Sequence, residues 1–210
     1  ETRMKLYWSD VLAPRKACAV AKYLQSPLDY VYLDLGRGEH KTAEYLALNP
    51  NGKVPTLVDG SRVLWEADAI ICHLAARSDS ELWPQDARQI DVIRWFSWSA
   101  QHFTAQAGAL YFEHIIKPRF GIGEADPVET GRATDAWRQH AAVVDGHLRD
   151  RRWLVGDTLT LADFAVAVAL PHADDAHIPL QDFPAIRRWH DRMNELDAWR
   201  EPFPEPAMSE

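Results

Sequence analysis

The chain has 210 residues, of which 47% are hydrophobic and 26% are charged, and its formal net charge is −8. These values are typical of a globular protein, and the length suits one large domain or two small ones. Lys and Arg are scattered along the sequence, which argues against a nucleic-acid-binding protein. No apolar run approaches the roughly 20 residues that cross a bilayer, and residues 1–4 carry no apolar signal-peptide core. We therefore expect a cytoplasmic protein that does not bind membranes.

The two cysteines, Cys18 and Cys72, lie far apart in separate apolar segments. This placement favours packed, reduced thiols over a disulfide framework or a metal site. We expect no bound metal.

The first 77 residues alternate between strand and helix patterns. Short aromatic or β-branched runs predict strands, and apolar residues at helical spacing predict helices. Dense turn signals separate them, notably Asn49-Pro50-Asn51-Gly52 and Asp59-Gly60. The expected elements are strands at 5–8, 30–35, 54–58 and 62–65 and helices at 14–24, 41–48 and 66–76. Their order is βαβαββα.

The second part of the chain shows helix patterns only. Residues 78–86 are polar and contain a proline, so they predict a linker. Long helices are expected at 87–116, 127–149, 160–170 and 184–196. The sequence therefore predicts an α/β domain at 1–77, a linker at 78–86 and an all-helical domain at 87–210.

Three segments carry a resemblance to one known family. The stretch 38–57 with its Val54-Pro55 pair, the Glu66-Ala67-Asp68-Ala69-Ile70 segment and residues 159–164 resemble motifs of the cytosolic glutathione S-transferase superfamily, in its bacterial, theta-, beta- or nu-like members. With the order of elements, the resemblance covers nearly the whole chain. It implies a thioredoxin-like domain that binds glutathione, followed by a helical-bundle domain that holds a hydrophobic electrophile.

The third of these segments also has a local explanation. Thr160 and Asp163 have the spacing of a capping box, in which each side chain bonds the other's backbone at a helix start. We expect both residues to serve stability and not catalysis.

The resemblance implies which residues hold glutathione. The Val54 backbone pairs with the cysteinyl unit because Pro55 is cis, Glu66 receives the γ-glutamyl amine, and the helix start at Ala67 offers N–H groups to the γ-glutamyl carboxylate. The family usually has a serine where this chain has Ala67, so weaker affinity is one expectation. Lys53 and His40 lie where the family places cations near the glycyl carboxylate, His40 being equally explained as a solvated residue.

A transferase must also lower the thiol pKa, because the thiolate is the nucleophile. Ser9 is the hydroxyl residue between the first strand and the first helix and is the leading candidate for donating a hydrogen bond to the thiolate. Tyr7 and the backbone N–H groups of the following loop remain alternatives. Trp8, beside the end of the first strand, is expected to line this pocket, with a position in the core as the alternative. No Cys-x-x-Cys precedes the first helix, which argues against disulfide exchange.

On the helix that starts near residue 87, Trp98, His102 and Phe103 either line the electrophile pocket or fill the core. The expected function is transfer of glutathione to a hydrophobic electrophile, or reduction of a peroxide by the same thiolate. The alternative is a catalytically weak carrier or stress-response module that binds glutathione or an apolar ligand. An isomerase or dehalogenase would use the same pocket, and the resemblance also implies a homodimer.

Overall fold

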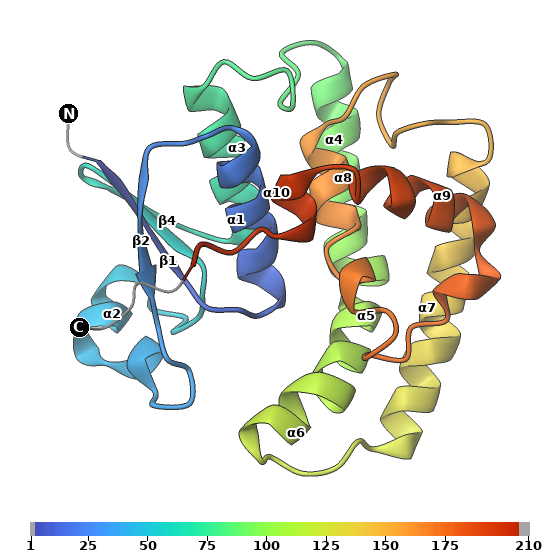
Figure 1. Ribbon diagram of the computed structural model, residues 1–210, viewed down its shortest axis with the longest axis horizontal. Helices are drawn as coiled ribbons and strands as arrows, with labels where there is room; N and C mark the ends of the chain where they lie inside the picture. Colours follow the sequence, from blue (N-terminus) through green and yellow to red (C-terminus); the bar gives the residue numbers. More distant parts are fainter. Residues whose placement is uncertain (1–2, 206–210) are drawn as a thin grey trace. The chain divides into compact units, whose positions relative to one another are not determined.

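The computed structural model describes residues 3–205 (Figure 1). These residues divide into two compact units. One contains the residues up to Ser80 together with those from Asp197 on, and the other is Glu81–Leu196.

The first unit is built on a mixed sheet with the strand order β2-β1-β3-β4. Its strands are β1 (Met4–Trp8), β2 (Leu28–Tyr32), β3 (Thr56–Asp59) and β4 (Arg62–Trp65). Strand β1 is parallel to β2, whereas β3 runs antiparallel to both β1 and β4. Met4, Leu6 and Trp8 alternate along β1 and are buried, which fixes the face that it turns to the core.

Two helices of this unit pack against each other. They are α1 (Leu12–Tyr23) and α3 (Ala67–Arg77). Alanines such as Ala17 and Ala21 are fully buried on α1, and such small side chains allow the two backbones to approach closely. Lys16 of α1 and Asp68 of α3 form an ion pair at 2.6 Å, which adds a polar link to this apolar contact.

A shorter helix lies on the other face of the sheet. After a 3-10 turn at Glu39–Lys41, α2 (Ala43–Leu48) begins at Thr42, whose side chain accepts a hydrogen bond from the Tyr45 N–H at 3.2 Å. The Tyr45 ring lies 5.6 Å from that of Tyr7, which points to the side of β1 opposite Leu6.

The end of the described chain belongs to the same unit. Helix α10 (Asp197–Arg200) follows the second unit in sequence. The Arg15 guanidinium of α1 donates to the Trp199 carbonyl at 2.7 Å, and Phe203 stacks on Trp8 with 5.3 Å between ring centroids. The expected helical domain at 87–210 differs from the observed division at this segment.

The second unit consists of helices and their connections. The helix expected at 87–116 is a longer continuous run in which α4 (Arg88–Trp98), α5 (Thr104–Tyr111) and α6 (Lys117–Phe120) are joined by π-helical turns at Ser99–Phe103 and Phe112–Ile116. The other helices are α7 (Pro127–Leu148), α8 (Leu161–Val166) and α9 (Pro184–Met193), with 3-10 turns at Leu170–His172 and Leu180–Asp182. In the part that the structure describes, no helix is long and apolar enough to cross a membrane.

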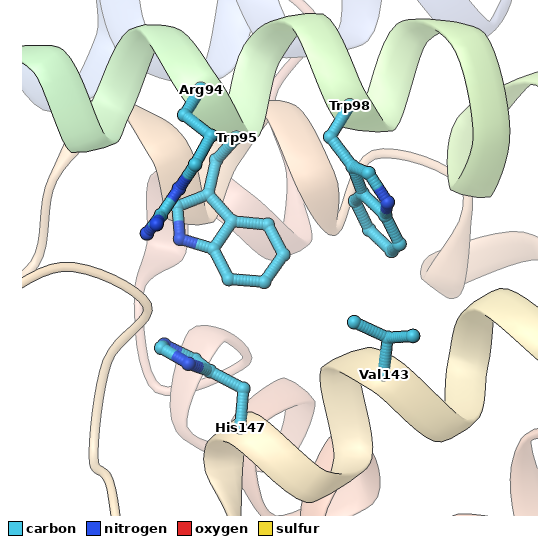
Figure 2. A pocket seen from close by; sticks show the side chains of 5 residues that line it. All are labelled: Arg94, Trp95, Trp98, Val143 and His147. Carbon is cyan, nitrogen blue, oxygen red and sulfur yellow. The ribbon is translucent and has the colours of Figure 1, made fainter.

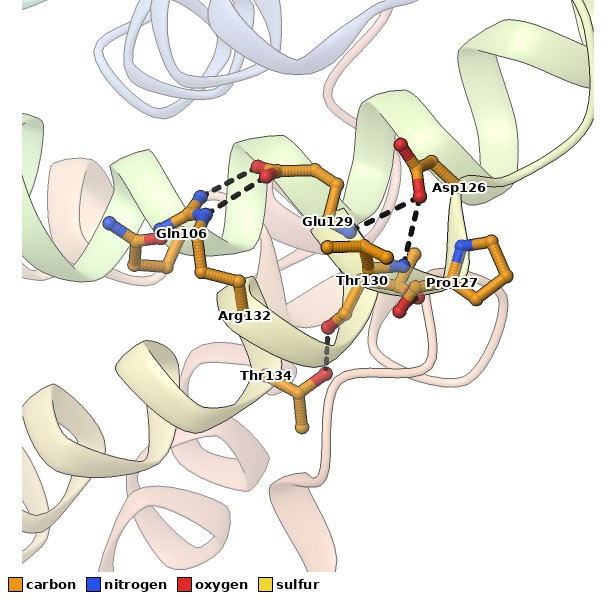
Figure 3. A network of polar contacts seen from close by, with 8 residues as sticks. Gln106, Asp126, Pro127, Glu129, Thr130, Arg132 and Thr134 are labelled. Carbon is orange, nitrogen blue, oxygen red and sulfur yellow. Dashed lines mark hydrogen bonds and ion pairs between the residues drawn. The ribbon is translucent and has the colours of Figure 1, made fainter.

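Local capping explains where two of these helices begin. The Asp126 side chain accepts hydrogen bonds from the Val128 and Glu129 N–H groups at 2.9 and 3.4 Å, ahead of Pro127 at the first position of α7 (Figure 3). At α8, the predicted capping box of Thr160 and Asp163 is present. This part of the prediction is confirmed.

Candidate functional site

Several chain segments meet at one edge of the sheet in the first unit. Tyr7 of β1 pairs with Thr56 of β3, and Thr56 pairs with Trp65 of β4. Because β3 is antiparallel to its neighbours, the carboxyl ends of β1 and β4 and the amino end of β3 lie together. The residues at these ends are Ser9, the Val54–Pro55 pair and Glu66. The structure therefore brings together segments that are far apart in the sequence.

The peptide bond between Val54 and Pro55 is cis. Pro55 is buried and Val54 is half-buried, just outside the strand that begins at Thr56. Among residues 3–205, neither the N–H nor the carbonyl group of Val54 takes part in a backbone hydrogen bond. Both groups are thus available to an extended ligand backbone, which is the role that the sequence resemblance implies for Val54.

A buried polar network holds this segment in place. The Tyr45 hydroxyl donates to the Lys53 carbonyl at 2.6 Å and lies 2.7 Å from the Thr56 hydroxyl, while the Asn49 amide donates to both acceptors at 2.9 and 3.1 Å. Since the carbonyl can only accept, the Tyr45 proton points to Lys53 and the Thr56 proton to Tyr45. Sequence analysis missed Tyr45, Asn49 and Thr56, although the Asn49-Pro50-Asn51-Gly52 turn marks their neighbourhood.

The two candidate cations differ in their surroundings. The Lys53 side chain is exposed. His40 is half-buried, and its Nδ1 atom is buried without a hydrogen-bond partner among the described residues. Burial, and then the neighbouring Lys41 charge, lower the His40 pKa from 6.5, so its imidazole is mainly neutral near pH 7. The structure therefore favours Lys53 as the cation.

Glu66 stands at the start of α3 in a rare backbone conformation. Its φ is 73° and its ψ is 116°, a region that residues other than glycine seldom adopt. Its carboxylate side chain is exposed, and its carbonyl accepts the first helical bond from Ile70 at 3.0 Å. No side chain caps α3, so the N–H groups that begin at Ala67 are open to an anion. Ala67 itself is buried and has no hydroxyl to add.

The hydroxyl candidates near the thiol position are Ser9 and Tyr7. Ser9 is 1% exposed, and its hydroxyl lies 3.5 Å from an Asp10 carboxylate oxygen, the outer limit of a hydrogen bond. Helix α1 begins at Leu12, and its cap residue Val11 makes no side-chain capping bond. Cys18 lies inside α1, and burial raises the pKa of its thiol to about 12, so this cysteine is an inert core group.

Trp8 has the surroundings of a core residue. It is 3% exposed, and its ring packs edge-on against Tyr32 at 5.2 Å and stacks on Phe203 at 5.3 Å. Of the two roles considered from sequence, this geometry supports packing over a pocket wall.

The three candidates on the long helix of the second unit have different surroundings. Trp98 lines a hollow of about 280 Å³ between α4 and α7, with Trp95 on its own helix and Val143 and His147 opposite (Figure 2). Phe103 is 1% exposed and stacks on Trp137, and is therefore core. His102 is exposed, with its ring 4.9 Å from that of His140.

Metal ions are bound in proteins by clusters of ligating side chains. Residues 3–205 hold no group of three or more His, Cys, Asp or Glu side chains that could bind a metal ion. This edge of the sheet therefore combines an unpaired backbone segment at Val54, the uncapped start of α3, and the exposed side chains of Glu66 and Lys53.

Comparisons with known proteins agree with this geometry. Family models described as the N-terminal and the C-terminal domain of glutathione S-transferase match residues 14–77 and 116–192. Glutathione S-transferase 3 of Zea mays is 30% identical over 98% of this chain and 98% of its own length.

Two solved structures extend the likeness to three dimensions. One is glutathione S-transferase III in its apo form, with 28% identity and a TM-score of 0.84 over 98% of this chain and all of the other. The second is a glutathione transferase of Phanerochaete chrysosporium in complex with oxidized glutathione, with 25% identity and a TM-score of 0.83 over 95% and 94% of the two chains. The chain belongs to the glutathione S-transferase family.

Proposed function

We propose that this glutathione transferase binds reduced glutathione at the sheet edge of the first unit and transfers its thiolate to a hydrophobic electrophile. The observation that carries the proposal is the meeting of cis Val54–Pro55 with the uncapped start of α3 at Glu66–Ala67. An extended peptide that pairs with the Val54 backbone has its amine and carboxylate partners directly beside it.

Each part of glutathione then has a partner. The Val54 N–H and carbonyl pair with the cysteinyl unit, Glu66 receives the γ-glutamyl amine, and the first N–H groups of α3 receive the γ-glutamyl carboxylate. The exposed Lys53 ammonium serves the glycyl carboxylate, and His40 is a neutral neighbour.

Ser9 is the proposed hydrogen-bond donor to the thiolate. Its hydroxyl follows β1 and precedes α1, and its bond to Asp10 at 3.5 Å is weak enough to exchange for a thiolate acceptor. The role is stabilisation of an anion and not nucleophilic attack, so the effect belongs in the thiol pKa and the rate.

The electrophile is assigned to the second unit, with Trp98 as its aromatic partner. Trp98 lines a hollow, whereas the buried Phe103 has little surface to offer. An exposed His102 beside His140 is a weaker candidate for a polar contact.

The proposal also includes residence in the cytoplasm and assembly as a homodimer. Light scattering of the protein as it elutes from a sizing column measures its mass and so tests the dimer.

The first test is calorimetric titration with reduced glutathione, followed by an absorbance assay with 1-chloro-2,4-dinitrobenzene. Binding with turnover is the expected result. Ser9→Ala should lower the rate about tenfold or more, the loss expected for a charged hydrogen bond, and should raise the pH at which the bound thiol ionises while leaving glutathione affinity within about twofold. Ser61→Ala, at an exposed position of the same unit, is the control.

A carrier is the second candidate function. It is favoured by the buried Ser9 and by Ala67, which has no hydroxyl for the γ-glutamyl carboxylate. Binding of glutathione without turnover of any electrophile or peroxide would support the carrier. No binding at millimolar glutathione would reject the transferase and a glutathione carrier, and would leave only a carrier of an apolar ligand.

A further inference from the structure

Arginines gather at one end of the second unit, where α7 ends and α9 runs alongside it. Two adjoining hollows, of about 200 and 680 Å³, share Asp150, Arg151 and Arg152 as lining residues. We call them together the arginine groove. The smaller hollow is lined by five arginines, which are Arg149, Arg151, Arg152, Arg188 and Arg192.

The charge of this groove is opposite to that of the chain. The whole protein carries a net charge of −8, yet the smaller hollow is lined by five arginines and a single acidic residue, Asp150. Within residues 3–205, the structure shows no ion pair for Arg149, Arg151, Arg152 or Arg188. Guanidinium groups crowded together without carboxylates repel one another, and a bound anion would remove that repulsion.

The arginines on α7 itself behave differently. Arg132 forms a two-pronged ion pair with Glu129 at 2.6 and 2.9 Å and donates to Gln106 at 3.1 Å (Figure 3). Arg138 of the same helix pairs with Asp182. The absence of ion pairs at the four groove arginines is therefore a local feature and not shared by the arginines of α7.

The groove is held by contacts that do not depend on a ligand. Arg192 is half-buried and donates to the Arg152 carbonyl at 2.6 Å. The guanidinium groups of these two residues lie 5.8 and 6.0 Å from the centre of the Trp153 ring. The following residue, Leu154, is fixed through its N–H to the buried Asp163 at 3.0 Å. Burial, followed by the nearby Arg152 charge, lowers the pKa of Arg192, in keeping with this crowding.

The acidic residues around the groove restrict what it can bind. Asp150 lines both hollows and Asp157 lines the larger one, which also contains Gly146, His147 and Gly156. Asp145 is occupied, since it accepts from the Ala185 and Ile186 N–H groups at the start of α9. A long polyanion would meet these carboxylates and the negative remainder of the protein. A compact anion with several charges would meet mainly guanidinium groups.

We propose that the arginine groove binds a small organic polyphosphate, with its phosphates in the smaller hollow and its organic part in the larger one. Guanidinium groups match phosphate oxygens in two-pronged hydrogen bonds, and the larger hollow has the size of small-molecule sites. This site is independent of the glutathione site.

The test is calorimetric titration of the full chain with inorganic tripolyphosphate and, separately, with ATP, at low and at physiological salt. The double variant Arg152→Gln/Arg188→Gln removes two exposed, unpaired guanidinium groups and should weaken binding at least tenfold, the change expected for lost charged hydrogen bonds. The control, Arg132→Gln/Arg138→Gln, removes the same charge from paired positions and should change affinity less than about threefold. Circular dichroism verifies that each variant is folded.

The outcomes separate the possible ligands. Tighter binding of ATP than of tripolyphosphate supports the whole proposal. Equal affinity supports the phosphate site in the smaller hollow and overturns the placement of an organic part in the larger one. The double variant Arg152→Lys/Arg188→Lys keeps the charge and should still lose affinity if two-pronged bonding is used. Equal losses in the glutamine variant and the control, no binding at millimolar ligand in low salt, or preference for long oligonucleotides over tripolyphosphate would overturn the proposal.

Discussion

At the scale of single residues, the Tyr45 hydroxyl holds the chain on both sides of Val54 and Pro55, through its bonds to Lys53 and Thr56. Tyr45→Phe leaves the Thr56 hydroxyl without its acceptor and removes one of two donors to the Lys53 carbonyl. We expect the free energy of unfolding to fall by about 1–3 kcal/mol and glutathione affinity to fall with it, since Val54 follows Lys53. Urea denaturation and calorimetry measure the two effects.

Tyr32→Phe is the matched control for this change, because it removes the same hydroxyl from a tyrosine that is 44% exposed. It should alter stability by less than about 0.5 kcal/mol. If the two tyrosine variants were equally stable, the network around Tyr45 would have no role in holding Val54.

Asp163 is the second residue with a defined effect, this time on pH dependence. Burial raises its pKa from 3.8 to about 6, although N–H groups of Leu154, Thr160 and Trp189 bond its oxygens. Between these two values the folded protein holds a proton that the unfolded chain has released, so stability falls as pH rises through about 6. The contribution lost from pH 4 to 7 is roughly 2 kcal/mol.

Urea denaturation of the wild type and of Asp163→Asn across that pH range measures this contribution. The advantage of the wild type over the variant should shrink with rising pH, because asparagine does not titrate. Asp135→Asn, which removes an exposed carboxylate on α7, is the control for the substitution itself. An advantage that stays constant or grows with pH would contradict the assigned protonation.

At the scale of elements, the start of α3 combines binding with backbone strain. Glu66 has a φ of 73°, which costs a residue other than glycine about 1 kcal/mol. Glu66→Gly should therefore leave the free energy of unfolding unchanged or raise it by up to about 1 kcal/mol, while glutathione affinity falls at least about tenfold with loss of the carboxylate. Ala69→Gly, at an exposed position within the same helix, should instead lower stability by about 1 kcal/mol.

Calorimetry and urea denaturation of these two variants separate strain from function. If Glu66→Gly lowered stability as much as Ala69→Gly, the strain at this position would carry no free energy. If it bound glutathione as tightly as the wild type, Glu66 would not be the partner of the γ-glutamyl amine.

Most elements could be predicted from sequence because their patterns are local. The short aromatic run at 5–8 and the capping box at 160–163 depend only on neighbouring residues, and a strand and a capped helix are observed at these places. The π-helical turns at Ser99–Phe103 and Phe112–Ile116 could not be predicted. Each is so short that the spacing of apolar residues around it still fits a continuous helix. Strand β2 begins at Leu28, two residues before the expected start, because pairing with Met4 decides where it begins.

The site could be predicted only as far as motifs reach. Val54, Pro55, Glu66 and Ala67 lie in matched segments, and the structure brings them to one edge. The burial of Trp8 by Phe203 depends on a contact across almost the whole sequence, which no local pattern encodes.

At the scale of the whole molecule, the clustering of positive charge on the surface could not be predicted from sequence either. Arg149 to Arg152 and Arg188 to Arg192 are separated in sequence and become one surface because α7 and α9 pack together. The scattered appearance of Lys and Arg along the chain therefore does not exclude a concentrated cationic site.

At the scale of the whole molecule, the last described segment belongs to the first unit, although it follows the second unit in sequence. Trp199 is fully buried, its carbonyl accepts from Arg15 at 2.7 Å, and the Arg15 guanidinium lies 5.6 Å from its ring centre. Trp199→Ala removes this buried ring from the first unit and should lower the free energy of unfolding by about 3–5 kcal/mol, with faster hydrogen exchange in α1 than in α7. Trp65→Ala removes a ring that is 40% exposed and should cost less than half as much. Equal losses of stability in the two variants, or hydrogen exchange that rises first in α7, would show that α10 does not complete the core around α1. The expected result would mean that the thioredoxin-like unit reaches its full stability only when the C-terminal segment is packed against it.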